Sequence, residues 1–424
     1  MLIIISNDAM VYEDIPVMEK FPAFRRFLDF NCRADRVHTI WPSLTHPVHA
    51  TMITGAPAGV TGIISNEICV PGQDGTPWFN DLKQIRCDTL LHACRRAGLV
   101  TCSCRWPVTG GDNGVVDYLL PEVIGEPPVS DPEAFYRGIG CGGMLDIVLR
   151  HAHETDGLGR HPAYDDQAVH CLCDVIREKK VDLCLTHLGL PDAFRHQYGV
   201  FSDRLEIAYA QTDAMLTELF DAVEQSGKWD ETDWLLVSDH GQLPIVRSVA
   251  LNAILREKGL LETNADGTLA GWRAYAHSTG LSAQIYVSDP AYENEVYRVL
   301  GEMARDGLYG FSQVLTADEA RERYGLYGDF RFAVETDGFT SFSNSLSRPF
   351  VRPLDPRDYR FGRATHGHMP EKGPQPTLLA MGPSFKRDAV LKNIDILDEA
   401  PLAARVLGVT LNDARGKAPL ALLK

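Results

Sequence analysis

The sequence predicts an α/β fold with a mostly parallel sheet covered by helices on both faces. Short, continuous apolar runs, typical of strands that are buried on both sides, occur at residues 2–6, 181–189, 233–241 and 377–382. Stretches with helical periodicity lie between them, at 88–98 and 203–225. Buried strands that alternate with amphipathic helices are the pattern of a parallel sheet enclosed by helices.

The length and the order of these elements predict an insertion. A single core rarely grows past roughly 300 residues, and the chain has 424. Residues 260–345 carry a strand-like LSAQIYVSD, a helix-like YENEVYRVLGEMARDG and a strand-like FSQVL. We therefore expect a core formed by 1–259 and 346–424, with 260–345 inserted as a small α+β cap. Residues 105–165, rich in Gly, Pro and Asp, are expected to form long loops with short helices.

Composition limits the partners and the compartment. The chain has 41 Lys and Arg against 57 Asp and Glu, a net charge of -16, which argues against a nucleic acid polymer as partner. A small phosphorylated ligand remains compatible, because a bound cation reverses the local field. No apolar run is long enough for a membrane span, so no membrane association is expected. The ten cysteines lack zinc-knuckle spacing, and we expect reduced thiols and a cytoplasmic location.

Acidic residues and histidines follow the predicted core strands. Ligands bind at the carboxyl ends of the strands in open α/β sheets, and carboxylates with imidazoles suit zinc or a similar transition metal. The candidate ligands are Asp8, Asp192, His196, Asp239, His240 and His366, enough for two metal ions. An isolated Asp after a strand is usually a turn or cap residue. The indication of a site comes from four such segments at one end of the sheet.

The segment WPSLTHPVHATMITG at 41–55 provides the candidate nucleophile. A helix is expected to start at Thr45, with Thr45 as the N-cap and Pro47 in the first turn. A hydroxyl there faces free backbone N–H groups and the positive end of the helix dipole, which favour an alkoxide and a phosphate oxygen. Thr45 is therefore the predicted nucleophile, while Ser43 and Thr51 are competing hydroxyls and a simple capping role for Thr45 is the alternative.

These motifs together carry a family resemblance. The segments PSLTHPVHATMITG, PDAFRH, SDHG and THGH resemble those of the nucleotide pyrophosphatase/phosphodiesterase (type I phosphodiesterase) family of the alkaline phosphatase superfamily. Gly62 to Asn66 is similar to the family's G-I-x-x-N, and 379–386 to its strand and turn near the C-terminus. One position departs, because the family often has Tyr where this chain has His368, whose role stays open.

The resemblance implies an alkaline phosphatase-like core, a reaction and a ligand set. The implied function is hydrolysis of phosphodiester or pyrophosphate bonds in small, nucleotide-like substrates through a phosphothreonine on Thr45, with Asn66 contacting a phosphoryl oxygen. Two zinc ions are implied, although other divalent transition metals are possible. One ion would be held by Asp192, His196 and His366, and the other by Asp8, Asp239, His240 and the Thr45 oxygen.

Related reactions on the same scaffold and one unrelated motif are the alternatives. Phosphonoacetate hydrolase and phosphomonoesterase activities use the same two-metal scaffold, and the former would need a basic side chain such as Arg105 near the site. A sulfatase is disfavoured because the Cys/Ser-x-Pro-x-Arg motif is missing. Residues 138–143 fit the dinucleotide pattern G-x-G-x-x-G, but no βαβ unit is predicted around them. Trp78, Phe79 and Trp106 are candidates for stacking on a base or aryl group.

Overall fold

The fold is organised around one large sheet. The computed structural model describes residues 1–73, 75, 77–111, 114–122, 131–155, 161–355 and 362–424. The sheet has eight strands in the order β19-β2-β18-β6-β1-β5-β3-β4. They are β1 (Leu2–Asn7), β2 (Cys32–His38), β3 (Thr101–Cys104), β4 (Tyr118–Leu120), β5 (Leu183–Leu188), β6 (Asp233–Val237), β18 (Leu378–Met381) and β19 (Val390–Asp395). All neighbours pair in parallel except β18, which is antiparallel to β2 and β6. The predicted α/β class is confirmed.

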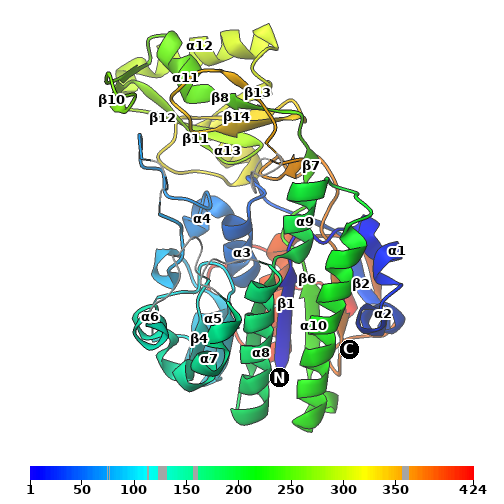
Figure 1. Ribbon diagram of the computed structural model, residues 1–424. Coiled ribbons are helices and arrows are strands. Elements are labelled where there is room, and N and C mark those ends of the chain that lie inside the picture. Colours follow the sequence, from blue (N-terminus) through cyan, green and yellow to red (C-terminus); the bar gives the residue numbers. More distant parts are fainter. Residues whose placement is uncertain (74, 76, 112–113, 123–130, 156–160, 356–361) are drawn as a thin grey trace.

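Helices cover both faces of this sheet (Figure 1). Alternate side chains of a strand point to opposite faces, and β1 accordingly serves two cores. Leu2 and Ile4 lie in a core with α3 (Thr45–Thr54), α5 (Leu90–Arg96) and α14 (Glu399–Leu407). Ile3 and Ile5 lie in a second core, with α2 (Pro22–Phe30), α8 (Ala163–Glu178) and α10 (Leu205–Gln225). The helices predicted at 88–98 and 203–225 are α5 and α10.

Strand register sets the position of the site. In the parallel pairs around β1, Asn7 lies opposite Leu188 of β5, and Ser6 lies opposite Val237 of β6. Three central strands therefore end at the same edge. The residues that follow them, including Asp8 and Asp239, meet there even though more than two hundred positions separate them in sequence.

The region 105–165 contains more helix than loop where it is described. It includes α6 (Pro132–Gly138), α7 (Leu145–His151) and two 3-10 turns, η3 (Cys141–Met144) and η4 (Ala152–Glu154). The glycine-rich stretch 138–143 joins α6 to η3 and is not preceded by a strand, in keeping with the rejection of a dinucleotide loop. Residues 112–113, 123–130 and 156–160 of this region lie outside the described residues.

A second body lies above the sheet in Figure 1. Its four-stranded sheet has the order β11-β12-β14-β13, formed by β11 (Ala274–Ser278), β12 (Ser282–Val287), β14 (Phe332–Thr336) and β13 (Phe311–Thr316). The helices α12 (Glu293–Asp306) and α13 (Ala317–Tyr324) accompany it. A three-stranded sheet joins β15 (Thr340–Ser343) to β8 (Arg247–Ala250) and β16 (Val351–Pro353). Side chains of β8 and α11 (Leu251–Glu257) share its core, so residues on either side of 260–345 also pack with the predicted cap.

Two whole-chain observations bear on the sequence expectations. All ten cysteines are free, as expected for reduced thiols. Among the helices of the described residues, none combines the length and the apolar character that crossing a bilayer requires.

Candidate active site

Six predicted ligand residues meet at the carboxyl edge of the large sheet. Asp8 follows β1, Asp239 and His240 follow β6, and His366 follows the short strand β17 (Ala364–Thr365). Asp192 and His196 lie on α9 (Leu190–Tyr198), which begins just after β5. All six are buried. Two groups have ligand atoms within 4.8 Å of one another, namely Asp192 with His240 and His366, and Asp8 with Asp239 and His240.

Helical spacing brings Asp192 and His196 together on α9, as predicted. His196 Nε2 lies 3.2 Å from Asp192 Oδ2. His196 Nδ1 lies 2.8 Å from the carbonyl oxygen of Ala364, and Gln242 Nε2 donates to Asp192 Oδ1 at 2.5 Å. Both side chains are therefore held from behind, so that each directs an atom into the site.

Asp239 and His240 converge at the bend after β6. His240 Nε2 lies 3.2 Å from Asp239 Oδ2 and 3.6 Å from Asp8 Oδ1. The other oxygen of Asp239 accepts a hydrogen bond from the backbone N–H of Ala9 at 3.2 Å. In a straight strand these neighbours would point to opposite faces, so the bend is what lets both contribute to the same site.

Burial shifts the protonation equilibria of these residues. Burial and the charges of Asp239 and Asp192 raise the pKa of Asp8 well above 3.8, and burial raises the pKa of Asp239 to about 6. Burial lowers the pKa of His240 to about 4. Buried carboxylates beside neutral imidazoles form a site that a cation stabilises, because the cation offsets their mutual repulsion.

The donor atoms fit divalent transition metals. Asp8 Oδ1 and Asp239 Oδ2 are buried and have no hydrogen-bond partner among the described residues, and His240 Nε2 is the ring nitrogen that faces both of them. His366 Nδ1 lies 3.1 Å from the Ser43 carbonyl oxygen, which leaves its Nε2 directed toward Asp192 at 3.8 Å. Metal-binding histidines are commonly oriented in this way, with one ring nitrogen held by a carbonyl or carboxylate oxygen. The set of imidazole and carboxylate ligands suits zinc.

Thr45 is the hydroxyl that faces this cluster. Its Oγ1 lies 3.4 Å from His240 Nε2, and its side chain is partly exposed. The two competing hydroxyls are buried, since Ser43 donates to the His368 carbonyl oxygen at 2.9 Å and Thr51 donates to that of Ala56 at 2.9 Å.

The expected N-cap role of Thr45 is wrong by one residue. Leu44 has extended backbone angles, φ -117 and ψ 147, and its carbonyl oxygen accepts the first helical bond, from Val48, at 3.0 Å. Leu44 is therefore the N-cap and Thr45 is the first helical residue. The Thr45 hydroxyl can turn toward His240 because it is not needed for capping.

Asn66 lies beside the start of α3. Its Oδ1 accepts the backbone N–H of His46 at 2.9 Å, and its side chain is partly exposed. His368, whose role the sequence left open, is buried and belongs to neither group of ligand atoms. Burial and the neighbouring His240 lower its pKa to about 3. The geometry thus places His366 rather than His368 among the candidate ligands.

The cap contacts the site loop directly through the turn between β11 and β12. The N–H of Leu281 donates to the His366 carbonyl oxygen at 3.0 Å, and Ser282 Oγ donates to that of Gly367 at 2.6 Å. Gly367 has φ +97, and a Cβ built there would lie 1.8 Å from the Thr279 carbonyl oxygen. The glycine of the HGH segment is needed for its backbone angle and for this close approach.

Sequence reasoning missed the residues that hold the candidate ligands. His187 Nε2 lies 2.9 Å from Asp8 Oδ2. Glu122 lies behind it, 3.7 Å from His187 Nδ1 and 3.1 Å from His46 Nε2. A histidine inside the otherwise apolar run at 181–189 was the one available signal, whereas nothing in the sequence indicated Gln242 or Glu122.

The remaining candidates from the sequence all pack against other side chains. Arg105 is buried, with its guanidinium carbon 3.4 Å from the ring centroid of Tyr164. Trp106 is buried against His49, with ring centroids 5.0 Å apart. Trp78 is half-buried, and its ring centroid lies 5.0 Å from that of His46, next to Thr45. Phe79 packs against the core.

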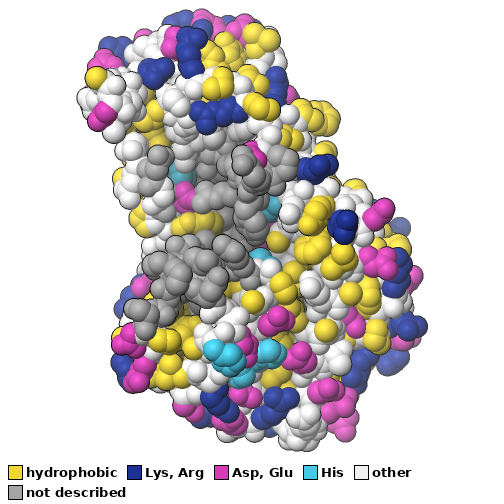
Figure 2. All heavy atoms as spheres, viewed as in Figure 1, with side chains coloured by type: hydrophobic (Ala, Val, Ile, Leu, Met, Phe, Trp, Pro, Cys, Tyr) yellow, Lys and Arg dark blue, Asp and Glu magenta, His cyan; other side chains and the backbone are white. Residues whose placement is uncertain are grey.

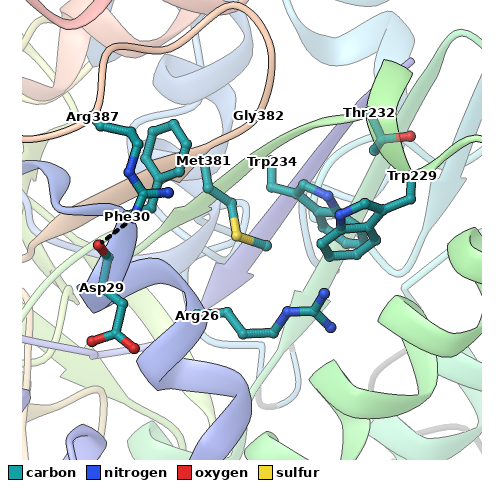
Figure 3. A pocket seen from close by; sticks show the side chains of 9 residues that line it. All are labelled: Arg26, Asp29, Phe30, Trp229, Thr232, Trp234, Met381, Gly382 and Arg387. Atoms are coloured by element: carbon teal, nitrogen blue, oxygen red, sulfur yellow. Dashed lines mark hydrogen bonds between the residues drawn. The ribbon is translucent and has the colours of Figure 1, made fainter.

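A separate hollow of about 350 Å³ lies at the opposite edge of the sheet, where β6 begins (Figure 3). It is lined by Trp229, Trp234 and two arginines among other residues. Arg26 lies over the ring of Trp229 at 4.0 Å and pairs with Glu224 at 3.0 Å. Arg387 donates to the Asp29 carbonyl oxygen at 3.0 Å. Both arginines already have partners, and no predicted catalytic residue lines this hollow.

Comparisons with known proteins identify a family and similar folds. The sequence model of the type I phosphodiesterase / nucleotide pyrophosphatase family matches residues 2–333. Among solved structures, the chain resembles inactive murine ectonucleotide pyrophosphatase/phosphodiesterase 5 in complex with AMP, at a TM-score of 0.71 and 17% identity over 100% of this chain and 99% of that one. The human protein of the same name gives 0.68 and 17%, over 98% and 97%. A search of curated proteins found no match.

Proposed function

Because the chain belongs to the type I phosphodiesterase / nucleotide pyrophosphatase family and is therefore a phosphodiesterase-type hydrolase, we propose that it cleaves phosphodiester or pyrophosphate bonds of small, nucleotide-like substrates with Thr45 as the nucleophile. The main support is the position of the Thr45 oxygen, 3.4 Å from His240 Nε2 and partly exposed at the edge of the buried carboxylates and imidazoles.

The residues around Thr45 have separate roles in this proposal. The start of α3 offers the positive end of its helix dipole to the Thr45 oxygen and to a phosphoryl group, although Pro47 has no N–H to contribute. The Oδ1 atom of Asn66 is occupied by the His46 N–H, which leaves the Asn66 amide nitrogen as a donor for a phosphoryl oxygen. Donors fixed in place before the reaction stabilise charge that develops on that oxygen.

The cluster would hold two divalent cations, with His196 joining the second ligand set from outside the group that Asp192, His240 and His366 form. Asp8, Asp239 and His240 would hold the one next to Thr45, and Asp192, His196 and His366 would hold the other. When bound, such ions, zinc by the nature of these ligands, would lower the pKa of the Thr45 hydroxyl and neutralise phosphoryl charge. This also accounts for an anionic substrate on a chain with a net charge of -16.

The substrate class is proposed from two features. The resemblance to an inactive ectonucleotide pyrophosphatase/phosphodiesterase in complex with AMP supports a small nucleotide, and Trp78 has a half-buried ring next to the Thr45 helix. No observation favours phosphonoacetate, because Arg105 is buried under Tyr164. A cytoplasmic location and the lack of a nucleic acid polymer or membrane partner remain predictions from the sequence.

The test compares nucleophile variants on two chromogenic substrates. We expect the wild-type protein to hydrolyse bis(p-nitrophenyl) phosphate faster than p-nitrophenyl phosphate. Thr45→Ala should lower kcat by about 10³-fold or more with an unchanged metal content, whereas Thr51→Ala should retain activity. Full activity of Thr45→Ala would refute the nucleophile, and a preference for the monoester would favour a phosphomonoesterase. A panel of nucleotide diesters, dinucleoside pyrophosphates and phosphonoacetate then identifies the leaving group.

A further inference from the structure

Two histidines and a glutamate form a compact cluster on the outside of the core. His151 ends α7, Glu154 ends the 3-10 turn η4, and His170 lies on α8. His151 Nδ1 lies 2.7 Å from Glu154 Oε1, and His170 Nδ1 lies 2.6 Å from Glu154 Oε2. This group shares no residue with the candidate active site. Figure 2 shows histidine side chains gathered beside acidic ones on the surface over α7 and α8.

Each imidazole of the cluster also contacts a second carboxylate. His151 Nε2 lies 3.0 Å from Asp174 Oδ2, and His170 Nε2 lies 3.1 Å from Glu218 Oε2. A neutral imidazole has one N–H group and one lone pair. If each Nε2–H donates to its outer carboxylate, both Nδ1 lone pairs face the oxygens of Glu154. Acceptors that face one another in this way repel unless a proton or a metal ion lies between them, and metal-bound histidines are usually supported by just such an outer carboxylate.

Exposure and charge also suit an ion. The side chains of His151 and Glu154 are each 19% exposed and that of His170 is 34% exposed, so an ion and a coordinating water can reach them. Three carboxylates surround the two imidazoles, while the nearby cations Arg150 and Arg177 both lie on Asp174, at 3.2 and 3.5 Å. A net negative environment therefore remains on the side of Glu154 and Glu218.

We propose that His151, Glu154 and His170 bind a divalent transition-metal ion of the zinc class, with Asp174 and Glu218 orienting the two imidazoles. The ligand atoms are the two Nδ1 nitrogens and a Glu154 oxygen, and water completes the shell. Zinc bonds of about 2.0–2.1 Å separate tetrahedral ligands by roughly 3.3 Å, so each of the two contacts between a histidine Nδ1 and Glu154, now 2.7 and 2.6 Å, would widen by less than ~1 Å. The ion joins α7 and η4 to α8, and its outer shell reaches α10, which stabilises this side of the core.

The test counts metal equivalents in the full-length protein. Wild-type protein and variants are stripped of metal with a chelator and titrated with Zn²⁺, with elemental analysis of the reloaded protein. We expect His151→Ala and His170→Ala, made separately, each to bind one equivalent fewer than the wild type. His153→Ala removes an exposed histidine from the same 3-10 turn and should bind as much as the wild type.

Two further measurements separate this site from the active site and from a purely structural role. Asp192→Asn should reduce binding at the active site and leave the equivalent that depends on His170 intact, whatever the outcome for catalysis. Asp174→Asn and Glu218→Gln should weaken Zn²⁺ binding at the surface site by about 10–100-fold, although neither side chain touches the ion. Equal stoichiometry in the wild type and a folded His151→Ala or His170→Ala variant would overturn the proposal and identify the cluster as proton-bridged ion pairs.

Discussion

The imidazole of His240 is stacked on that of His366, with ring centroids 3.9 Å apart and planes inclined by 15°. Two rings in such close contact cannot both carry a proton charge at low cost. Burial and this proximity lower the pKa of His366 well below its ordinary value, and burial lowers that of His240 to about 4. Both rings are therefore neutral near pH 7 and present lone pairs to cations.

His366→Ala is expected to remove one of the active-site metal equivalents and to lower kcat by at least about 100-fold, because it deletes a candidate ligand that no neighbour replaces. Metal content after reloading and hydrolysis of bis(p-nitrophenyl) phosphate are the measurements. His368→Ala is the matched control for metal content, since His368 belongs to neither group of ligand atoms. Metal loss from His368→Ala and not from His366→Ala would reverse the assignment.

His187→Ala is expected to weaken binding of the active-site metal by about 10–100-fold. His187 Nε2 lies 2.9 Å from Asp8 Oδ2 and holds that carboxylate in place. Titration of the metal-stripped protein with Zn²⁺ measures the change. His187→Gln keeps a donor in the same direction and should recover part of the affinity. Equal affinities in the Ala variant and the wild type would show that Asp8 does not need this contact.

Arg195→Met is expected to lower the free energy of unfolding by about 3–5 kcal/mol, because it leaves the buried Asp14 carboxylate without its cation. Arg195 is fully buried and pairs with Asp14, and its Nε donates to the Ala9 carbonyl oxygen at 3.0 Å. Chemical denaturation measures the change. Arg137→Met is the control, since its ion pair with Glu133 is 62% and 61% exposed and should contribute less than about 1 kcal/mol. Equal losses in both variants would contradict this account.

Glu335 predicts a pH-dependent stability. Burial raises its pKa from 4.5 to about 7, although Lys372 lies 3.0 Å away. The folded state therefore binds the proton more tightly than the unfolded state. This contribution is fully present below pH 4.5 and is lost as the pH rises through 7.

Glu335→Gln mimics the protonated form and should remove this loss, which is on the order of 3 kcal/mol. Urea denaturation of the wild type and the variant between pH 5 and pH 8 provides the comparison. Glu133→Gln, at an exposed position, should follow the wild-type curve. Parallel curves for Glu335→Gln and the wild type would show that Glu335 is ionised throughout this range.

Continuous apolar runs made the centre of the sheet predictable. The runs at 181–189 and 233–241 contain β5 and β6, and the run at 2–6 covers all of β1 but its last residue; all three strands are buried along their whole length. The strands β2 and β19 were missed because polar residues interrupt both and both include exposed residues. The order of the strands, with β18 antiparallel beside β6, depends on contacts between distant segments that local patterns do not encode.

The site residues that directly follow a predicted strand could be identified from the sequence, and those placed by tertiary packing could not. Asp8, Asp192 and Asp239 each follow a predicted strand, and the fold rule that assigns function to that edge identified them. Glu122 contacts the site only because folding brings its backbone close to it, and although Gln242 lies two residues after His240, the local pattern does not show that its side chain reaches Asp192. Arg105 looked available in the sequence, yet the fold buries it.

The glycine at 367 has a bearing on how this architecture can diversify. The Thr279 carbonyl oxygen occupies the space where a side chain at position 367 would begin, and the Leu281 N–H donates to the His366 carbonyl oxygen. The turn that precedes β12 and the HGH segment at 366–368 therefore fit together only as a pair. Replacing the cap by that of a relative would therefore succeed only when the turn before β12 and the segment 366–368 are transferred together.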